Sequence, residues 1–220
     1  MIRTPEEWER RFKHIGALWI HSGRKRAPHA LLTSGKHSNG FFNSELVMQD
    51  PSLLTEACED LVELLHNASR FLDEFDRVVG PALGAITLAH EFARTAAVYR
   101  KSPCLRAYTE KRVVAGRDMM VFDRTRVLPG ERVLLVEDVI TTGKSVTLAT
   151  RAVDAAGGIP LSLVVSLVNR SGLPAVDGRT IISLINRALP AWESADCPLC
   201  KHGSEAIRPK GKENWALLTA

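Results

Sequence analysis

The stretch RVLLVEDVITTGKSV, residues 132–146, runs four apolar residues into two adjacent carboxylates, Glu137 and Asp138. Hydroxyls, a glycine and a lysine follow. The apolar run predicts a strand over 132–137 that is buried on both faces of a sheet, and a helix is expected over 144–156. Because ligands of open α/β sheets bind at the carboxyl ends of strands, the loop between these elements is the predicted binding site.

The loop over residues 139–145 has the composition of an anion cradle. Free backbone N–H groups and the dipole at a helix N-terminus favour an anion, and Thr141, Thr142 and Ser145 add hydroxyl donors. Gly143 allows close approach of the backbone. A nucleotide-binding P-loop, G-x-x-x-x-G-K-[ST], is excluded because the position of its first glycine is Asp138.

The two carboxylates therefore need another role. An acidic pair before a phosphate cradle can accept hydrogen bonds from a sugar diol while the cradle holds the 5-phosphate of the same sugar. It can also hold Mg²⁺, directly or through water. The implied ligand is a ribose 5-phosphate, and the alternative is an unoccupied pair of exposed acids at the end of a strand.

The 220 residues, 45% of them apolar and 25% charged, are typical of a soluble globular protein with one sizeable core. Strands alternate with helices, which predicts an α/β fold with a parallel sheet flanked by helices. Strands are expected at 77–80, 104–109, 132–137, 161–168 and 180–185, and helices at 5–21, 53–65, 85–96 and 144–156. We expect a single domain over 1–220, with a core from about 46–170 and a small cap from about 1–45 and 171–220.

The charge pattern favours an anionic small molecule as ligand over nucleic acid. The net charge is +4, and Arg24, Lys25 and Arg26 form the tightest basic cluster. No apolar run approaches the roughly 18 residues of a membrane span, and the N-terminus lacks the apolar region of a secretory signal. These features predict a cytoplasmic protein that acts neither on nucleic acid nor in a membrane.

The four cysteines fit a reducing compartment. Cys197 and Cys200 have the spacing of metal ligands, and His202 lies near them. A structural zinc ion requires four ligands, and the sequence shows no second pair. A C-terminal turn with two reduced thiols is the favoured interpretation, and a zinc site is the alternative.

VLLVEDVITTGKS resembles the signature with which type I phosphoribosyltransferases bind 5-phosphoribosyl 1-diphosphate (PRPP). VVGPALGAITLAHEFA, residues 78–93, is similar to the family's diphosphate turn, and residues 109–133 resemble its hairpin with a mobile basic loop. The resemblance implies a type I phosphoribosyltransferase-like fold, catalytic roles for Glu137, Asp138 and Lys111, and Mg²⁺ at Asp138, directly or through water. The PRPP contacts that it implies are Glu137, Asp138, Val139, Ile140, Thr141, Thr142, Gly143, Lys144, Ser145, Pro81, Ala82, Leu83, Gly84 and Lys111.

Further stretches resemble the orotate branch of this family. Purine-salvage members usually have aspartate at the position of Thr141, whereas the orotate branch has threonine. LLTSGKHSNGFFN, residues 31–43, is similar to a segment that implies base contacts for Phe41 and Phe42. SLVNRSG, residues 166–172, resembles V-D-R-S-G, whose arginine pairs with the orotate carboxylate, so Arg170 takes that role. The tail CPLCKHGSEAIRPKG is similar to the end of one bacterial and archaeal branch.

This resemblance implies transfer of the phosphoribosyl group from PRPP to orotate, with Mg²⁺ as cofactor and a homodimer as the assembly. The chain departs from the family pattern at Ala85, Lys144 and Asn169, and the cations of its basic loop are Lys111, Arg112 and Arg117. Two alternatives stay open. One is the same chemistry on another base, and the other is a regulator that senses PRPP without turnover.

Overall fold

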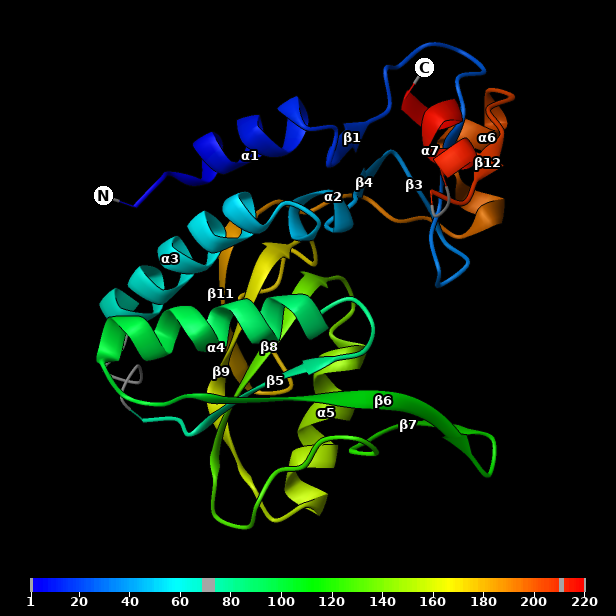
Figure 1. Ribbon diagram of the computed structural model, residues 1–220. Coiled ribbons are helices and arrows are strands. Elements are labelled where there is room, and N and C mark those ends of the chain that lie inside the picture. Colours follow the sequence, from blue (N-terminus) through cyan, green and yellow to red (C-terminus); the bar gives the residue numbers. More distant parts are fainter. Residues whose placement is uncertain (1, 69–73, 210–211, 220) are drawn as a thin grey trace.

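The fold is built on a seven-stranded sheet, and the computed structural model describes residues 2–68, 74–209 and 212–219 (Figure 1). The strand order is β10-β11-β9-β8-β5-β6-β7. The strands are β5 Arg77–Pro81, β6 Leu105–Val114, β7 Arg117–Val121, β8 Arg132–Ile140, β9 Ile159–Asn169, β10 Ala175–Val176 and β11 Arg179–Asn186. Neighbours from β11 to β6 are parallel, whereas β7 and β10 run antiparallel at the edges. The predicted α/β fold is confirmed, with an antiparallel strand at each edge of the parallel sheet.

Helices cover both faces of this sheet, as Figure 1 shows. They are α3 Pro51–Ala68, α4 Ile86–Arg100 and α5 Lys144–Ala155. Side chains of β8 alternate between two cores: Leu134 and Val136 pack with α3 and α4, whereas Val133 and Leu135 pack with α5. The continuous apolar run of β8 follows from burial on both faces.

The strand that carries the acidic pair is longer than the sequence predicted. β8 ends at Ile140 rather than near residue 137, so Glu137 and Asp138 lie within the strand. Neighbouring side chains of a strand point to opposite faces, so the two side chains leave β8 toward opposite faces, although the carboxyl of Glu137 stays close enough to Asp138 to interact with it. This geometry decides what each acid can contact.

The N-terminal helix is shorter than expected. The sequence predicted a helix over 5–21, whereas α1 covers Pro5–His14. Gly16 adopts φ +75°, the left-handed conformation that often follows the last helical turn. The chain then enters β1, Leu18–Ile20, so the second half of the predicted helix is wrong.

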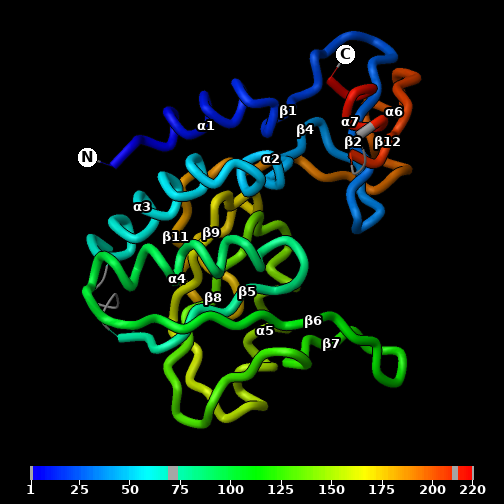
Figure 2. Tube along the Cα trace, in the orientation of Figure 1, coloured from blue at the N-terminus to red at the C-terminus, as the bar shows by residue number. Residues whose placement is uncertain are grey.

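Two small sheets and three short helices, α2, α6 and α7, occupy the two ends of the chain. β1 pairs with β4, and β2 pairs with both β3 and β12. The bounds are β2 His29–Leu31, β3 His37–Ser38, β4 Gly40–Phe42, α2 Glu45–Met48, a 3₁₀ turn Ser194–Asp196, α6 Pro198–Lys201, β12 Ala206–Ile207 and α7 Lys212–Thr219. In Figure 2 the blue N-terminal strands and the orange and red C-terminal segments lie side by side. We call β2, β3, β12, α6 and α7, with β1 and β4, the cap.

The C-terminal part of the cap begins later than the expected residue 171. β10 and β11 fall in the range 171–220, yet β11 hydrogen-bonds to β9 in the large sheet. Residues 210 and 211 of the tail that resembles a family branch lie outside the described residues. Within the described part of the chain, no helix has the length and apolar character needed to cross a membrane.

Candidate active site

The loop after β8 leads into α5 through Gly143, which has φ +76°. A Cβ atom at this position would lie 1.9 Å from Cγ2 of Val176, so both the conformation and the space require glycine. Thr141 and Thr142 are exposed, and the loop lines a small pocket. The residues around that pocket are Glu137, Val139, Ile140, Thr141, Thr142, Gly143, Lys144, Ser145 and Val146. The predicted anion cradle is thus a pocket at the N-terminus of α5.

Glu137 is the buried member of the acidic pair, with 7% of its surface exposed. It lines the pocket of the loop, and its Oε1 accepts a hydrogen bond from the backbone N–H of Asp138 at 3.2 Å. Burial, and then the charge of Asp138, raise the pKa of Glu137 well above its usual range. Glu137 therefore keeps its proton at a higher pH than an exposed glutamate and can donate as well as accept hydrogen bonds.

Asp138 lies on the opposite face, where two other segments meet it. The hydroxyl of Ser44 donates to its Oδ2 at 2.6 Å. Gly84 packs against the carboxylate so closely that a Cβ there would lie 3.1 Å from both oxygens. Ser44 was missing from the predicted site residues; it directly precedes α2 but makes no side-chain cap hydrogen bond to that helix. Asp138 thus joins the start of α2 to the turn before α4.

The turn over residues 81–84 is held at this edge of the sheet by backbone hydrogen bonds. The N–H of Ala82 donates to the carbonyl of Thr109 at 2.7 Å, and the peptide bond between Ala82 and Leu83 is cis. A Cβ at Gly80 would lie 2.4 Å from the carbonyl oxygen of Ala85. Ala85 itself is fully buried, so the alanine that departs from the family pattern fits the start of α4. The predicted diphosphate turn lies beside Asp138.

The hairpin of β6 and β7 extends beyond the other strands of the sheet (Figure 1). Asp118 in this hairpin forms ion pairs with two lysines. Lys111 Nζ lies 3.1 Å from Asp118 Oδ1, and Lys144 Nζ contacts Asp118 Oδ2. Hydrogen bonds from Lys144 and Lys111 lower the pKa of this partly exposed carboxyl. Arg112 pairs with Asp123 instead. The structure therefore brings Lys111 to the predicted anion cradle over residues 139–145, which we call the phosphate loop. The link is Asp118, an aspartate that the sequence analysis did not single out.

Arg170 is 5% exposed and follows β9, next to the loop after β8. Its backbone N–H donates to the carbonyl of Ile140 at 2.9 Å, and its Nη2 donates to the hydroxyl of Ser38 at 3.1 Å. No carboxylate of the described residues forms an ion pair with the guanidinium, and burial lowers the pKa of Arg170 to about 10. A buried cation without an anion is costly, so this position is prepared for a negatively charged group.

Phe41 and Phe42, both predicted to contact a base, point in opposite directions from β4. Phe42 is 3% exposed and packs edge-on against Phe12 in the main core, with ring centroids 6.1 Å apart. Phe41 packs against Trp215 of the cap at 5.8 Å. Phe42 is therefore a core residue on the opposite face of β4 from Phe41, and its predicted base contact is untested. The base contact of Phe41 stays a prediction.

Asn169 shapes the turn after β9 at the position where the family pattern has aspartate. Its amide nitrogen donates to the carbonyl of Leu173 at 2.8 Å and to Oδ1 of Asn186 at 3.2 Å. Its Oδ1 accepts from the backbone N–H of Ser171 at 3.1 Å and from that residue's hydroxyl. A carboxylate could not make the two donations, so this asparagine fits the local hydrogen bonding around Arg170.

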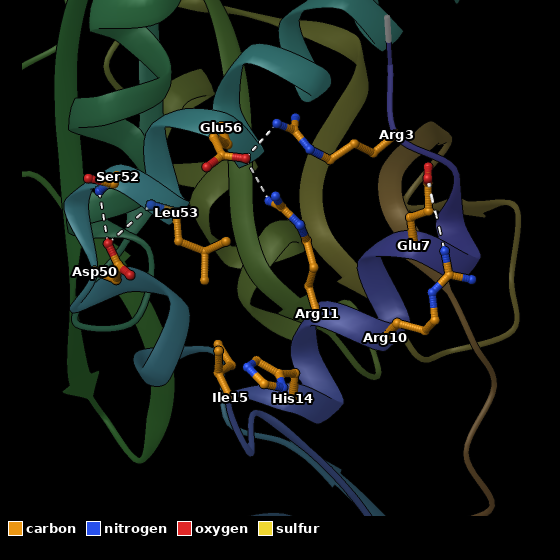
Figure 3. A pocket seen from close by; sticks show the side chains of 10 residues that line it. All are labelled: Arg3, Glu7, Arg10, Arg11, His14, Ile15, Asp50, Ser52, Leu53 and Glu56. Atoms are coloured by element: carbon orange, nitrogen blue, oxygen red, sulfur yellow. Dashed lines mark hydrogen bonds and ion pairs between the residues drawn. The ribbon is translucent and has the colours of Figure 1, made fainter.

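A second, larger pocket lies between α1 and α3, away from these residues (Figure 3). Its volume is about 590 Å³, and it is lined by Arg3, Glu7, Arg10, Arg11, His14, Ile15, Asp50, Ser52, Leu53 and Glu56. Two of its arginines already pair with Glu56 (Figure 3), at 2.5 Å for Arg3 and 2.6 Å for Arg11. We place the site at the phosphate loop, where backbone N–H groups and buried ionisable side chains converge.

Known proteins are similar to this chain in sequence and in fold. The phosphoribosyl transferase domain family matches residues 50–189. Orotate phosphoribosyltransferase of Pelotomaculum thermopropionicum is 36% identical over 204 residues, which cover 90% of this chain and 97% of that protein. Its counterpart in Acidithiobacillus ferrooxidans is 36% identical over 89% of this chain and 94% of its own. The crystal structure of orotate phosphoribosyltransferase from Aeropyrum pernix has a TM-score of 0.58 at 23% identity, covering 80% of this chain and 92% of that one, and it supports the fold alone.

Proposed function

The chain belongs to the phosphoribosyltransferase family, and we propose that it transfers the 5-phosphoribosyl group of PRPP to orotate, giving orotidine 5'-phosphate and diphosphate. Orotate is supported as the base by one observation: the guanidinium of Arg170 is buried and has no ion-pair partner among the described residues. Orotate has a carboxylate, whereas uracil and the purine bases have none. A bidentate pair between the two would satisfy both charges.

The loop after β8 binds the 5-phosphate in this proposal. The N-terminus of α5 offers backbone N–H groups and a favourable dipole, and the hydroxyls of Thr141 and Thr142 are exposed beside it. Gly143 brings the backbone close because no side chain fits there. These groups recognise a phosphate monoester without contacting the base.

The acidic pair acts on the ribose. As the bond from C1 to the diphosphate breaks, positive charge develops on the ring, and the negative Asp138 stabilises it. Ser44 fixes the carboxylate orientation through its 2.6 Å hydrogen bond. Glu137, with its raised pKa, can donate to or accept from a sugar hydroxyl. Both roles rest on positioning rather than on covalent catalysis.

The diphosphate leaves toward the turn over residues 81–84 and the lysines that meet at Asp118. Lys111 and Lys144 carry the positive charge there, and both can exchange Asp118 for phosphate oxygens. Asp138 fits Mg²⁺, because its partly exposed carboxylate supplies the oxygen ligand that this ion prefers. When bound, Mg²⁺ would neutralise charge on the diphosphate as it departs.

The test is a panel of bases with PRPP and Mg²⁺: orotate, uracil, hypoxanthine, guanine and adenine. We expect orotate to be consumed with equimolar formation of orotidine 5'-phosphate, followed by chromatography. Turnover of another base but not of orotate would replace orotate by that base. Binding of PRPP by calorimetry with no turnover of any base would identify a regulator that senses PRPP.

The remaining expectations are also proposals. Loss of turnover in excess EDTA, restored by Mg²⁺, would support the metal requirement. Sedimentation equilibrium tests the homodimer, and a single chain as the active species would contradict it. The cytoplasmic location stays a prediction from the sequence, and fractionation of the host cell tests it.

A further inference from the structure

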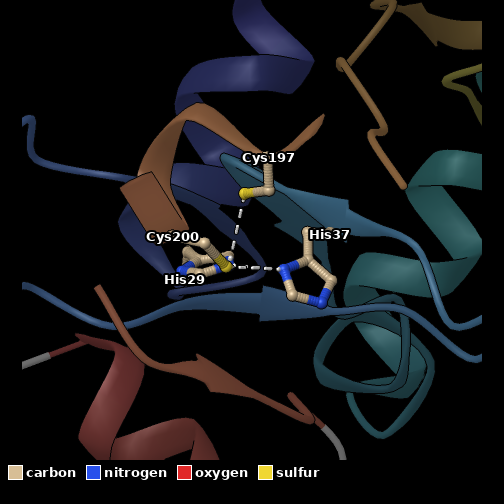
Figure 4. Close-up of side chains that lie close together, drawn as sticks. All are labelled: His29, His37, Cys197 and Cys200. Atoms are coloured by element: carbon tan, nitrogen blue, oxygen red, sulfur yellow. Dashed lines mark hydrogen bonds between the residues drawn. The ribbon is translucent and has the colours of Figure 1, made fainter. Parts of the chain in front are cut away.

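Four metal-binding side chains converge inside the cap, far from the phosphate loop in sequence (Figure 4). They are His29 of β2, His37 of β3, Cys197 directly before α6 and Cys200 within α6. One nitrogen or sulfur atom of each lies within 4.8 Å of those of the others. His29 and Cys197 are fully buried and His37 is 6% exposed. The second ligand pair that the sequence did not reveal is this pair of histidines.

The distances between the nitrogen and sulfur atoms of these side chains match a tetrahedron around one metal ion. Zinc bonds of about 2.3 Å to sulfur and about 2.0–2.1 Å to nitrogen give a sulfur–nitrogen edge of about 3.6 Å. Both cysteine sulfurs lie 3.6 Å from His29 Nε2, and Cys200 Sγ lies 3.2 Å from His37 Nδ1. The two nitrogens are 2.9 Å apart, somewhat less than the tetrahedral edge of about 3.3 Å. Small rotations of the rings would complete the geometry.

The hydrogen bonds of Ser204 fix the proton of His29 on the outer side of its ring. The hydroxyl of Ser204 donates to the carbonyl of Ala27 at 2.5 Å, so its oxygen accepts from His29 Nδ1 at 2.7 Å. Nε2 then carries a lone pair directed at the other three side chains. Such an outer hydrogen bond is what holds a metal-binding histidine in its orientation.

We propose that His29, His37, Cys197 and Cys200 bind one zinc ion as a closed structural site. Two thiolates and two imidazoles in a tetrahedral arrangement favour zinc over the other common divalent ions. Binding releases one proton from each thiol to solvent. Four protein ligands leave no position for substrate, so the ion acts on the fold and takes no part in the transfer reaction. His202 is exposed and outside this set.

The site joins the two ends of the chain where the cap has little apolar core. The strands of the cap are two or three residues long, and the buried residues of its cluster are Trp19, Ala30 and Leu218. Small modules of this kind commonly depend on a metal or a disulfide. His37 directly precedes Ser38, whose hydroxyl contacts Arg170. Zinc would therefore also hold the strand that meets the proposed base site.

Metal analysis of the full-length wild type, purified without a histidine tag, is the first test. We expect zinc in equimolar amount to the chain, retained on dialysis and released when a mercurial blocks the thiols. Cobalt substituted for zinc should give the intense visible bands of a tetrahedral ion and a sulfur-to-cobalt charge-transfer band. Wild type that holds no zinc after incubation with zinc and a reductant would overturn the proposal.

Variants separate the ligands from their neighbours. Cys197→Ser and Cys200→Ser should lose most of the zinc, whereas the matched controls Cys104→Ser and His202→Ala should retain it. His29→Cys keeps four ligands and should bind cobalt with a stronger charge-transfer band, which a variant that merely unfolds could not do. Retention of zinc by both cysteine variants, or its loss from both controls, would contradict the assignment.

A thiol titration of the unfolded wild type addresses the competing arrangement, a disulfide between Cys197 and Cys200. All four cysteines of the chain should react without reduction, because none is paired in the proposed site. Two unreactive cysteines that appear after reduction would replace the zinc site by a disulfide. These readouts do not depend on turnover, so failure of the proposed activity would leave them intact.

Discussion

The large sheet and the cap reach their folded form in different ways. The strands of the large sheet from β5 to β9 have five to eleven residues, and the sheet is buried between α3 and α4 on one face and α5 on the other. The cap has strands of two or three residues, and its contacts join segments as far apart as His29 and Ser204, 175 positions along the chain. Apolar burial stabilises the first region, whereas the second has a small apolar cluster, and polar contacts and the four proposed zinc ligands join its segments.

The difference also separates two kinds of recognition. The residues proposed to bind the phosphoribosyl group are those of the phosphate loop and the acidic pair, and they lie on β8 of the large sheet and at the start of α5. The position proposed to select the base, Arg170, contacts Ser38 of the cap. In this proposal, contacts to PRPP lie on the large sheet, and base selection lies where the two regions meet.

We expect the largest effect of a single substitution at Arg170, where the large sheet meets the cap. Arg170→Ala should lower kcat/KM for orotate by roughly 100-fold or more, because breaking a buried ion pair on one side costs about 3–5 kcal/mol. Affinity for PRPP, measured by calorimetry, should change little. Arg187→Ala, which removes a partly exposed partner of Glu9, is the control. Equal turnover by wild type and Arg170→Ala would show that the orotate carboxylate binds elsewhere.

The stability of a second variant at this position, Arg170→Met, is a further test of the unpaired charge. Arg170 has no ion-pair partner among the described residues, and burial disfavours its charge. Arg170→Met should therefore leave the free energy of unfolding unchanged or higher, in contrast to removal of one partner of a structural ion pair.

A substitution in the acidic pair tests the proposed contribution of the large sheet to turnover. Asp138→Asn should reduce turnover by roughly 10-fold or more, since a hydrogen bond to a charged group contributes about 1.5–3 kcal/mol. Steady-state kinetics with varied PRPP would measure it. Asp123→Asn, in the exposed pair with Arg112, serves as the control. Unchanged kinetics for Asp138→Asn would exclude its role beside the ribose.

The stability of the sheet itself should depend on Glu131. Its carboxylate accepts from Arg77 at 2.7 and 2.8 Å and from the backbone N–H of Leu128 at 2.8 Å. Glu131→Gln should lower the free energy of unfolding at neutral pH by about 1.5–3 kcal/mol. Glu193→Gln, in the exposed pair with Lys36, should have almost no effect.

The stabilisation from the ion pair of Glu131 with Arg77 should decrease at acidic pH. Hydrogen bonds from Arg77 lower the pKa of Glu131 below its unfolded value. Its stabilising contribution is therefore complete above the unfolded pKa, near 4.3, and is lost as the pH falls through the lower folded pKa. The difference in stability between wild type and Glu131→Gln should shrink over that window, as measured by urea unfolding. A difference that grew on acidification would contradict the assignment.

The smallest effect is expected in the cap. Ser38→Ala removes the hydroxyl that accepts from Arg170 and donates to the carbonyl of Pro190 at 2.6 Å. The loss of about 1 kcal/mol per hydrogen bond corresponds to roughly a 5-fold increase in KM for orotate, with KM for PRPP unchanged. Ser34→Ala, in an exposed turn, is the control. An equal rise in both KM values would point to general distortion of the cap.

Much of the large sheet could be predicted from local patterns. The helices α3 to α5 and the parallel strands of the large sheet appear near their expected positions, because apolar periodicity and the glycine turns are local properties of the chain. The antiparallel edge strands β7 and β10 were not among the expected strands. The phosphate loop was found for the same reason, since its residues are consecutive. The end of the first helix was misjudged, because the apolar spacing of Leu18 and Trp19 fits a helix as well as a strand that packs on β4.

The sequence by itself determined the α/β class and located the candidate anion-binding loop and the acidic pair, all of which depend on residues close together in the chain. Only the tertiary structure decided that Phe42 belongs to the core, that Ser44 and Gly84 meet Asp138, and that Asp118 joins Lys111 to Lys144. It alone brought His29 and His37 to the cysteines of α6. The physical reason is distance along the chain: strand pairing and packing set which remote side chains meet, and periodicity carries no information about such pairs.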